Sequence, residues 1–402
     1  MRRIRLYILA PNDRFNYGDL LFPYVLRYAL PKDLGEFIYC STSESDLSQW
    51  GGVETKGFNV LYELDPNYDN YLIIAGGEGL FAPWASIISF FDKRIDKLIK
   101  QVDKFRLRKF LGANLVSKIL QSIVVKSYNI KTYFPFTIGK SEVQNLKGVF
   151  YNAVGGGGLV YNKEFKREFY RALLEDSQYI SVRDQNTSDY LDSIGITHTL
   201  VPDSVIIISN IFNESILYNR VNEKIKKQAE NSEYIFFQIR YSIWQKEKHE
   251  VIAQLRLLLA QYKICLCPIG TALGHSDDLS ISEIIHTLHS QNIIKIESPT
   301  IWDIMWLIKH SKLYIGTSLH GIITSMSYNV PYISHSQLKI KTYLETWGDN
   351  NFQHFCNISD IYNVANGLIN SPYSFDVQKQ KDMVMGSIKR IEQIISSNSK
   401  ED

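Results

Sequence analysis

The chain has 402 residues, of which 45% are hydrophobic and 21% are charged. This composition is that of a folded protein and excludes a disordered or fibrous chain, while the length exceeds what one ordinary core holds and predicts two domains. The 44 basic and 42 acidic residues nearly cancel. A nucleic-acid-binding protein would be more basic, so we expect no nucleic-acid partner.

The N-terminal residues and the cysteines bear on where in the cell the protein is located. Residues 1–10 begin with basic residues, but the apolar run that follows is short and ends at Pro11, which predicts a first strand rather than a signal peptide. No stretch approaches the ~20 apolar residues of a membrane helix. The four cysteines are scattered, which is typical of reduced thiols in a cytosolic protein. Cys265 and Cys267 alternate along an apolar run, which favours strand packing over a metal site.

Short β-branched or aromatic runs alternate with segments of helical period, as in parallel sheets with crossover helices. In the first half, helices are predicted at 20–30 and 163–174. The predicted strands are residues 4–9, 37–40, 71–75, 149–153, 179–182 and 198–201. Together they predict a doubly wound domain over residues 1–205, on the acceptor side of the site.

A second series follows the polar stretch 213–233. Its predicted strands are residues 234–239, 264–269, 293–297, 313–316 and 331–334, and its predicted helices are residues 250–261, 281–290 and 300–310. This series predicts a second doubly wound domain over residues 206–402, on the donor side. Open α/β sheets bind ligands at the carboxyl ends of their strands, so the site should lie in a cleft between the two domains.

The segment 93–131 departs from the even charge balance. It holds eleven lysine or arginine residues and two aspartates, interleaved with apolar residues. A basic helix with an apolar stripe can lie on an anionic membrane surface. The alternative is a solvated basic helix whose stripe packs on its own domain. We expect a cytoplasmic protein, and a location at the inner face of the cell membrane is the alternative that this segment leaves open.

The strongest local signal is the segment 313–333, in which a strand turns through small and polar residues into a helix. His320 and Gly321 lie where this helix opens. Unpaired N–H groups and the positive end of the helix dipole make such a start an anion site, and a histidine placed there can titrate near neutral pH. The alternative is that Ser318 only caps the helix and His320 is a packed polar residue.

Other predicted strands also end in polar or small residues. Arg183 follows the strand at 179–182, where a guanidinium can clamp a carboxylate or phosphate, or can simply pair with Asp184. Asn16, Asp19 and residues 76–79 follow two other strands, and 155–158 is a run of glycines. Turn glycines let a ligand approach the backbone, while Asp19 and Glu78 can bind sugar hydroxyls. Each of these glycines can also be purely conformational.

Taken in order, these pieces resemble the polysaccharide pyruvyl transferase family. The matching motifs are Asn16-x-Gly-Asp19, Gly76-Gly-x-Gly79, Ile180-Ser-Val-Arg-Asp184, Pro202-Asp203, Leu319-His-Gly321, Val330-Pro-Tyr-Ile333 and Lys339. The resemblance implies two Rossmann-like domains in the glycosyltransferase-B arrangement. It also implies transfer of a pyruvyl group from phosphoenolpyruvate, as co-substrate, onto a sugar of a capsule or other exopolysaccharide of the cell envelope or its precursor. The acceptor is a saccharide, with a lipid-linked form left open.

The resemblance also assigns roles. His320 would be the acid/base residue, protonating the methylene carbon of phosphoenolpyruvate before a hydroxyl attacks, and Arg183 a catalytic, anion-binding residue. Leu319 and Gly321 would form the substrate-binding turn around His320, and Lys339 would be the substrate-binding basic residue after the last strand. Asn16, Asp19, Gly76, Gly77, Glu78 and Gly79 would lie on the acceptor side. No metal and no cofactor are implied.

One departure bears on the donor, because many family members have an arginine two residues before the histidine and this chain has Ser318. Either Thr317, Ser318 and Lys339 take over anion binding, or the donor differs. Glu78, where glycine is common, is a smaller departure. Two alternatives stay open: a nucleotide-sugar glycosyltransferase of the same architecture, and a catalytically silent homologue that binds glycan.

Overall fold

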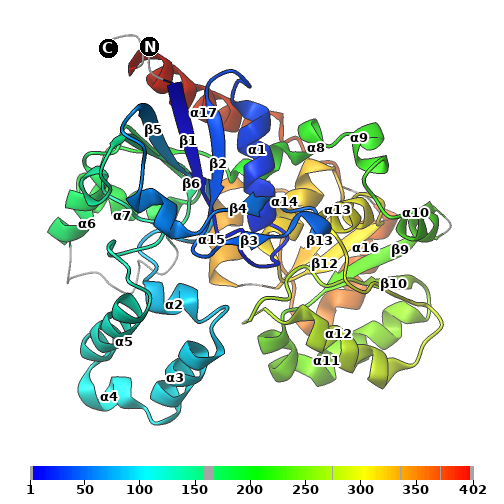
Figure 1. Cartoon of the computed structure of the whole chain (residues 1–402). Helices are drawn as coiled ribbons and strands as arrows, with labels where there is room; N and C mark the ends of the chain where they lie inside the picture. The colour runs from blue at the N-terminus through cyan, green and yellow to red at the C-terminus, as the bar shows by residue number, and fades with distance from the viewer. Residues whose placement is uncertain are drawn as a thin grey trace.

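A computed structural model describes residues 3–156, 167–230, 232–273, 275–335, 337–371 and 373–398, which form two parallel sheets side by side (Figure 1). The first sheet has the order β2 (Glu36–Cys40), β1 (Arg3–Leu9), β5 (Tyr68–Ile74), β6 (Leu146–Val154), β7 (Tyr179–Val182) and β8 (Thr199–Leu200). The second has the order β11 (Ile293–Lys295), β10 (Lys263–Leu266), β9 (Tyr234–Gln238), β12 (Leu313–Gly316) and β13 (Tyr332–Ser334).

Alternate side chains of the strands enter different cores. In β1, Leu6 and Ile8 belong to a central core, whereas Tyr7 and Leu9 belong to an outer core. A strand covered on both faces needs apolar residues at every position, which is why these strands read as continuous apolar runs in the sequence. The strands of the second sheet divide in the same way between the central core and a third cluster.

The central core joins the two halves. It contains residues of α1 (Phe22–Ala29) and α17 (Gln378–Asn398) from one side, and of α13 (Ile301–Lys309) and α14 (Leu319–Ser327) from the other. Helix α17 follows the second sheet in sequence but packs on α1 and β6 (Figure 1). The last helix, which the prediction assigns to the second domain, therefore covers the first sheet; the boundary at residue 205 stays a prediction.

The remaining helices cover the outer faces and connect the sheets. Around the first sheet lie η1 (Asp19–Leu21), α2 (Trp84–Ile88), α3 (Lys93–Lys104), α4 (Leu107–Leu111), α5 (Ala113–Ser127), α6 (Arg167–Leu174) and α7 (Gln185–Ser193). The connection contains η6 (Ser204–Ile207), α8 (Ile208–Ile211), α9 (Glu214–Tyr218) and α10 (Glu223–Glu230). The second half adds α11 (Tyr241–Leu259), α12 (Asp277–Leu288), α15 (Leu338–Trp347) and α16 (Ile361–Asn370).

Every predicted strand is present, as are the predicted helices at 20–30, 250–261, 281–290 and 300–310. Residues 163–166 of the predicted helix at 163–174, and residues 157–158 of the glycine run, lie outside the described residues. The prediction of a single basic helix over 93–131 is wrong. The chain forms α3, α4 and α5 there, because Arg106 and Gly112 take positive φ angles of 52° and 85° that interrupt a helix. Within the described ranges, no helix is long and apolar enough to cross a bilayer.

Candidate functional site

A cavity of about 240 Å³ lies between the two halves, at the carboxyl ends of their strands. Of the residues predicted to form the site, the following line it: Asn16, Asp19, Gly76, Glu78, Gly79, Arg183, Thr317, Ser318, Leu319, His320 and Lys339. The structure thus brings together segments that are more than 300 residues apart in the sequence. Gly77 and Gly321 are the predicted residues that do not contribute to the lining.

His320 is the second residue of α14, and Ser318 is the N-cap, its hydroxyl accepting from the Gly321 amide at 3.4 Å. The imidazole packs edge-on against Phe22, with 5.5 Å between ring centroids. A Cβ atom at Gly18 would lie 1.7 Å from Nδ1 of His320. Gly18, in the turn after β1, is therefore glycine because the histidine ring occupies the space of its side chain.

The two predicted glycines outside the lining have conformational or packing roles. Gly77 has a φ of 87°, a backbone region that other residues rarely adopt. A Cβ atom at Gly321 would lie 2.1 Å from the hydroxyl oxygen of Tyr314, which is buried beneath α14. Gly321 thus allows α14 to pack closely on β12, and it supports His320 without facing the cavity.

Arg183, Asp203 and His320 lie together in a buried group. Nη1 of Arg183 lies 2.7 Å from Oδ2 of Asp203, and Nη2 pairs with Glu78. The same Asp203 oxygen lies 3.4 Å from Nε2 of His320. Burial by itself would raise the pKa of Asp203, but the positive charges of His320 and Arg183 outweigh it and hold that pKa below its usual value. Asp203 thus stays ionised and faces the histidine.

Asp19 is buried and accepts a 2.7 Å hydrogen bond from Nδ2 of Asn16. Burial raises its pKa, against the opposing charges of Arg14 and His320. Such a carboxylate accepts a proton more readily than an exposed aspartate. Asp19 therefore combines the geometry of a hydroxyl-binding group with the properties of a base.

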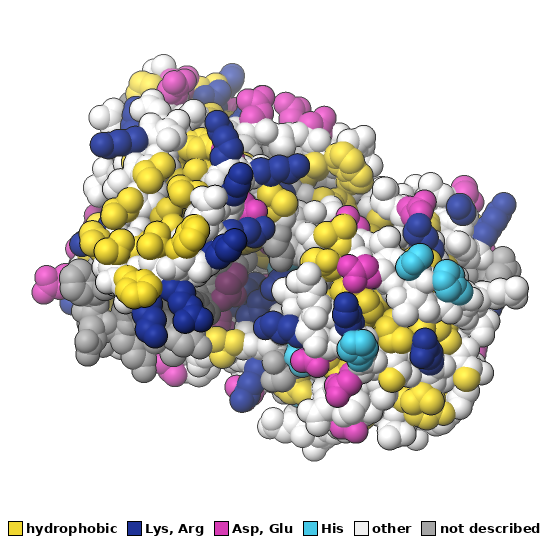
Figure 2. Space-filling model, turned by 90° about the horizontal axis from the view of Figure 1, so that it is seen from below, with side chains coloured by type: hydrophobic (Ala, Val, Ile, Leu, Met, Phe, Trp, Pro, Cys, Tyr) yellow, Lys and Arg dark blue, Asp and Glu magenta, His cyan; other side chains and the backbone are white. Residues whose placement is uncertain are grey.

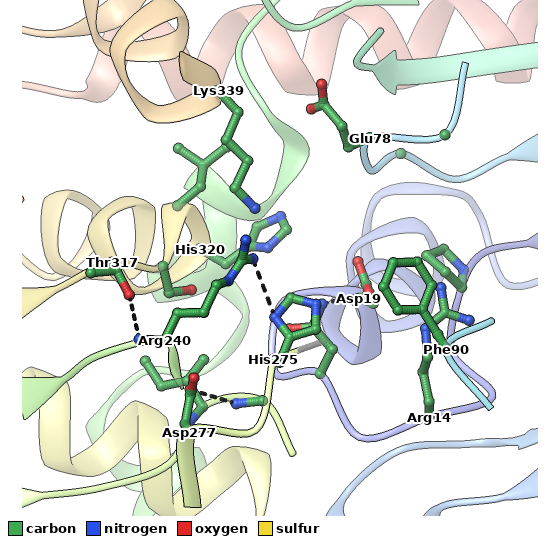
Figure 3. Close-up of a pocket in the computed structure, with 18 of the residues that line it drawn as sticks. Arg14, Asp19, Glu78, Phe90, Arg240, His275, Asp277, Thr317, His320 and Lys339 are labelled. Carbon is green, nitrogen blue, oxygen red and sulfur yellow. Dashed lines mark hydrogen bonds between the residues drawn. The ribbon is translucent and has the colours of Figure 1, made fainter. Parts of the chain in front are cut away.

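Two cations enter the cavity from the second half. Arg240 follows β9, and Lys339 lies in the first turn of α15; Figure 3 shows both side chains directed toward His320. Among the described residues, neither has a carboxylate within ion-pair distance. Burial, and then the charge of Arg240, lowers the pKa of Lys339 to about 8. An anion in the cavity would supply the negatively charged partner that neither side chain has among the described residues.

A chain of hydrogen bonds fixes Arg240. The Thr317 hydroxyl accepts from the Arg240 amide at 2.9 Å, and the Thr317 amide donates to Gln238 at 2.9 Å. Gln238 in turn donates to Asp277 at 2.8 Å, and Asp277 also accepts from two backbone amides of the loop after β10. Thr317 therefore acts mainly as a link that holds the ends of β9 and β12 in place.

His275 completes the wall of the cavity. Its Nδ1 lies 3.3 Å from Nη2 of Arg240. Burial lowers the pKa of His275 to about 3, helped by the charges of Arg240, Lys339 and Arg14. The ring is thus neutral at physiological pH, and its Nδ1 is free to accept the hydrogen bond from the arginine.

Sequence reasoning missed Arg14, Arg240, His275 and Asp277. Arg240 follows a predicted strand as Arg183 does, so the same strand-end signal was present at residues 234–239 and was not followed. Arg14 lies beside the recognised Asn16–Asp19 turn, where its guanidinium is 5.2 Å from the ring centre of Phe90. His275 and Asp277 lie in an irregular loop and at a helix start, where no periodic pattern marks them.

A family model of polysaccharide pyruvyl transferases matches residues 16–334, which include Asp19, Arg183, Arg240 and all of α14, whereas Lys339 lies beyond the matched range. The chain belongs to the polysaccharide pyruvyl transferase family. The resemblance noted in the sequence is therefore confirmed. No curated protein matches this polysaccharide pyruvyl transferase family member.

Solved structures show the same fold at low identity. UDP-GlcNAc 2-epimerase of Methanocaldococcus jannaschii, in complex with UDP-GlcNAc and UDP, is 13% identical with a TM-score of 0.52, over 98% of this chain and 99% of that one. UDP-GlcNAc 2-epimerase of Neisseria meningitidis, bound to UDP-GlcNAc, is 11% identical with a TM-score of 0.50, over all of both chains. The predicted fold class, two Rossmann-like domains in the glycosyltransferase-B arrangement, is confirmed for this pyruvyl transferase family member.

Proposed function

We propose that this chain transfers the pyruvyl group of phosphoenolpyruvate onto two hydroxyls of a saccharide, forming a ketal and releasing phosphate. The saccharide would belong to a cell-surface polysaccharide or its precursor. The observation that carries the proposal is the placement of His320 beside two cations, Arg240 and Lys339, that have no carboxylate partner among the described residues. A small donor with two anionic groups and a carbon to be protonated matches this arrangement.

The donor would bind through its charges. Arg240 offers a planar guanidinium suited to a carboxylate or phosphate, and Lys339 offers a point charge on the same side of the cavity. The N-terminus of α14 adds the positive end of a helix dipole. Together these groups would neutralise phosphoenolpyruvate in a cavity of about 240 Å³.

Arg240 can replace the arginine that many family members have where this chain has Ser318. Ser318 is used as the helix N-cap, so its hydroxyl is engaged with the Gly321 amide. Arg240 reaches the neighbourhood of His320 from the adjacent strand β9 instead. We therefore assign the missing guanidinium function to Arg240, which keeps phosphoenolpyruvate as the proposed donor.

The reaction would begin at His320. Its proton passes to the methylene carbon of phosphoenolpyruvate, and the adjacent carbon becomes electron-poor. A sugar hydroxyl then attacks that carbon, and Asp19 takes the hydroxyl proton. The carbon–oxygen bond to phosphate breaks, and phosphate leaves with the proton held by Asp19. A second hydroxyl closes the ketal, and its proton restores His320. General acid catalysis of this kind contributes ~10²–10⁴-fold.

Arg183 would act by positioning. The catalytic, anion-binding role expected for it stays a prediction. In the structure its guanidinium already binds Asp203 and Glu78. Asp203 in turn faces the imidazole of His320 at 3.4 Å. Arg183 would therefore keep Asp203 ionised and in place, so that a protonated His320 has an ion-pair partner in a buried site.

Titration calorimetry with phosphoenolpyruvate tests the donor. We expect saturable binding that weakens tenfold or more in Arg240→Ala, since a hydrogen bond to a charged group contributes ~1.5–3 kcal/mol. Lys339→Ala should also weaken binding, because it removes the second cation of the cavity. Lys341→Ala is its matched control, because Lys341 lies on the same helix but is exposed and pairs with Glu345. Binding of UDP-GlcNAc with no response to phosphoenolpyruvate would overturn the proposal.

A further inference from the structure

Helices α2 to α5, residues 84–131, form a lobe beside the first sheet, at the lower left of Figure 1. The lobe is anchored at its base. The indole N–H of Trp84 donates to the Thr132 carbonyl at 3.2 Å, and the Gln121 side chain accepts from the Ala85 amide at 3.2 Å and donates to the Tyr133 carbonyl at 2.9 Å. α4, which follows α3, projects farthest from the sheet.

Helix α5 carries two apolar stripes. Val116, Leu120 and Val124 are buried in the outer core of the first sheet. Leu115, Ile119 and Ile123 have the same spacing, one position earlier, and are 51%, 48% and 41% exposed. A helix that only covers its own domain needs one stripe. The second stripe has no partner within the described structure that buries it.

The exposed stripe continues onto α4 and the turn before it. Phe105, Phe110 and Leu111 are 63%, 77% and 53% exposed, the largest values among the exposed large apolar side chains described in the protein. We call these six residues the lobe patch. Contiguous apolar surface of this kind marks an interaction site, whereas single exposed apolar residues do not.

Basic residues surround the lobe patch. Of the eleven lysines and arginines in residues 93–131, Arg94, Lys100 and Arg108 pair with aspartates at 2.9, 2.7 and 2.9 Å. The segment itself contains two acidic residues, Asp96 and Asp103, and Asp92 directly precedes it, so basic residues outnumber acidic ones by eleven to three. Figure 2 shows lysine and arginine beside the hydrophobic side chains, on the face where the molecule is hollowed between its two halves.

The lobe also borders the cavity. Ile87 of α2 and Phe90, just after it, line the cavity, and Phe90 lies beside Arg14. The lobe that carries the patch therefore also forms part of the cavity wall.

We propose that the lobe patch docks this protein onto an anionic lipid bilayer, with the aromatic and aliphatic side chains at the headgroup boundary and the basic residues on the anionic headgroups. Apolar side chains rimmed by lysine and arginine are the combination that binds such surfaces. A second copy of the chain is a poorer occupant, because a symmetric contact would place this basic segment against itself. The inference does not depend on the donor or the reaction proposed above.

Vesicle co-sedimentation of the full chain tests the inference. We expect binding to vesicles containing phosphatidylglycerol, little binding to pure phosphatidylcholine, and loss of binding at high salt because exposed charges are screened. Phe110→Ser combined with Leu111→Ser should reduce binding at least tenfold, and Lys104→Glu combined with Lys109→Glu should do the same. All four residues are exposed, so these variants should fold.

Matched controls lie on α11. Leu257→Ser removes a side chain that is also about half exposed, and Lys246→Glu reverses an exposed charge outside the lobe. Both should bind vesicles as the unaltered protein does. Absence of binding to anionic vesicles would overturn the inference, as would equal loss in the control variants. A further outcome is a protein that sediments as a dimer, which Phe110→Ser dissociates, and that does not bind vesicles. That result would overturn the inference and assign the lobe patch to contact with a second copy of the chain.

Discussion

At the scale of single residues, Gly18 decides where His320 can lie. A Cβ atom there would lie 1.7 Å from Nδ1 and 2.0 Å from Cγ of the imidazole, so Gly18→Ala must displace the ring or the turn. A displacement of about 1 Å at a reacting group can cost ~10²-fold in rate. We expect Gly18→Ala to lower kcat by that order with a smaller effect on donor affinity.

Gly367→Ala is the control for this substitution. Gly367 lies in α16, and nothing is within 4 Å of where its Cβ atom would be placed. The kcat of the Gly367→Ala variant should match that of the unaltered protein. Unchanged turnover in Gly18→Ala, with the variant folded, would show that the position of His320 does not matter to the reaction.

The proton on Lys339 should make donor binding depend on pH. Burial, followed by the charge of Arg240, lowers its pKa to about 8, so the ammonium loses its proton as the pH rises through that value. The affinity for phosphoenolpyruvate should then fall above pH 8, by up to about tenfold per pH unit. Calorimetry from pH 7 to 9.5 measures this fall. In Lys339→Arg the charge persists, so the affinity should stay level; the same decline in both proteins would exclude Lys339 as its cause.

The candidate site shows what residue patterns can predict. His320, Asp19 and Arg183 were found because each follows a strand at the edge where parallel strands end. The pairing of Arg183 with Asp203 and Glu78 was not predicted, because it depends on the distances between separate strands. Arg240 carried a usable signal, whereas His275 acquires its neutral state only from burial in the folded protein.

At the scale of elements, α17 ties the C-terminus to the first half. Ile388 is fully buried in the central core, where α17 packs on α1 and β6. Ile388→Ala should lower the free energy of unfolding by about 2–5 kcal/mol through lost burial and the cavity left behind. Urea denaturation measures the change. Lys389→Ala, at the neighbouring exposed position, should change the free energy of unfolding little. If both substitutions lowered it equally, the buried face of α17 would not contribute to the stability of the core.

The elements also differ in how far the sequence determines them. The strands were predicted to within a few residues, since a strand buried on both faces is a short apolar run with clear ends. The division of the lobe into three helices was not predicted. α3, α4 and α5 share one basic and apolar pattern, and the positive φ angles of Arg106 and Gly112 separate them. The place of α17 could not be predicted either, because its apolar period does not identify the sheet it covers.

At the scale of the whole molecule, one core spans both sheets. It contains Leu6 and Phe22 from the first half and Phe236 from the second, and the Tyr17 hydroxyl lies 2.9 Å from that of Thr324 across the junction. Proteins of this length often unfold one domain at a time. A shared core opposes this, because neither half can unfold without exposing the apolar surface of the other.

We therefore expect one cooperative unfolding transition. Ile264→Ala tests this, because Ile264 lies in the outer cluster of the second half, away from the first sheet. The substitution should destabilise the whole chain, so hydrogen exchange of β5 in the first sheet and of β10 around Ile264 should accelerate by the same factor under mildly denaturing conditions. If β5 kept its protection while β10 lost it, the two halves would be independent folding units, and the central core would be an interface between domains rather than a shared core.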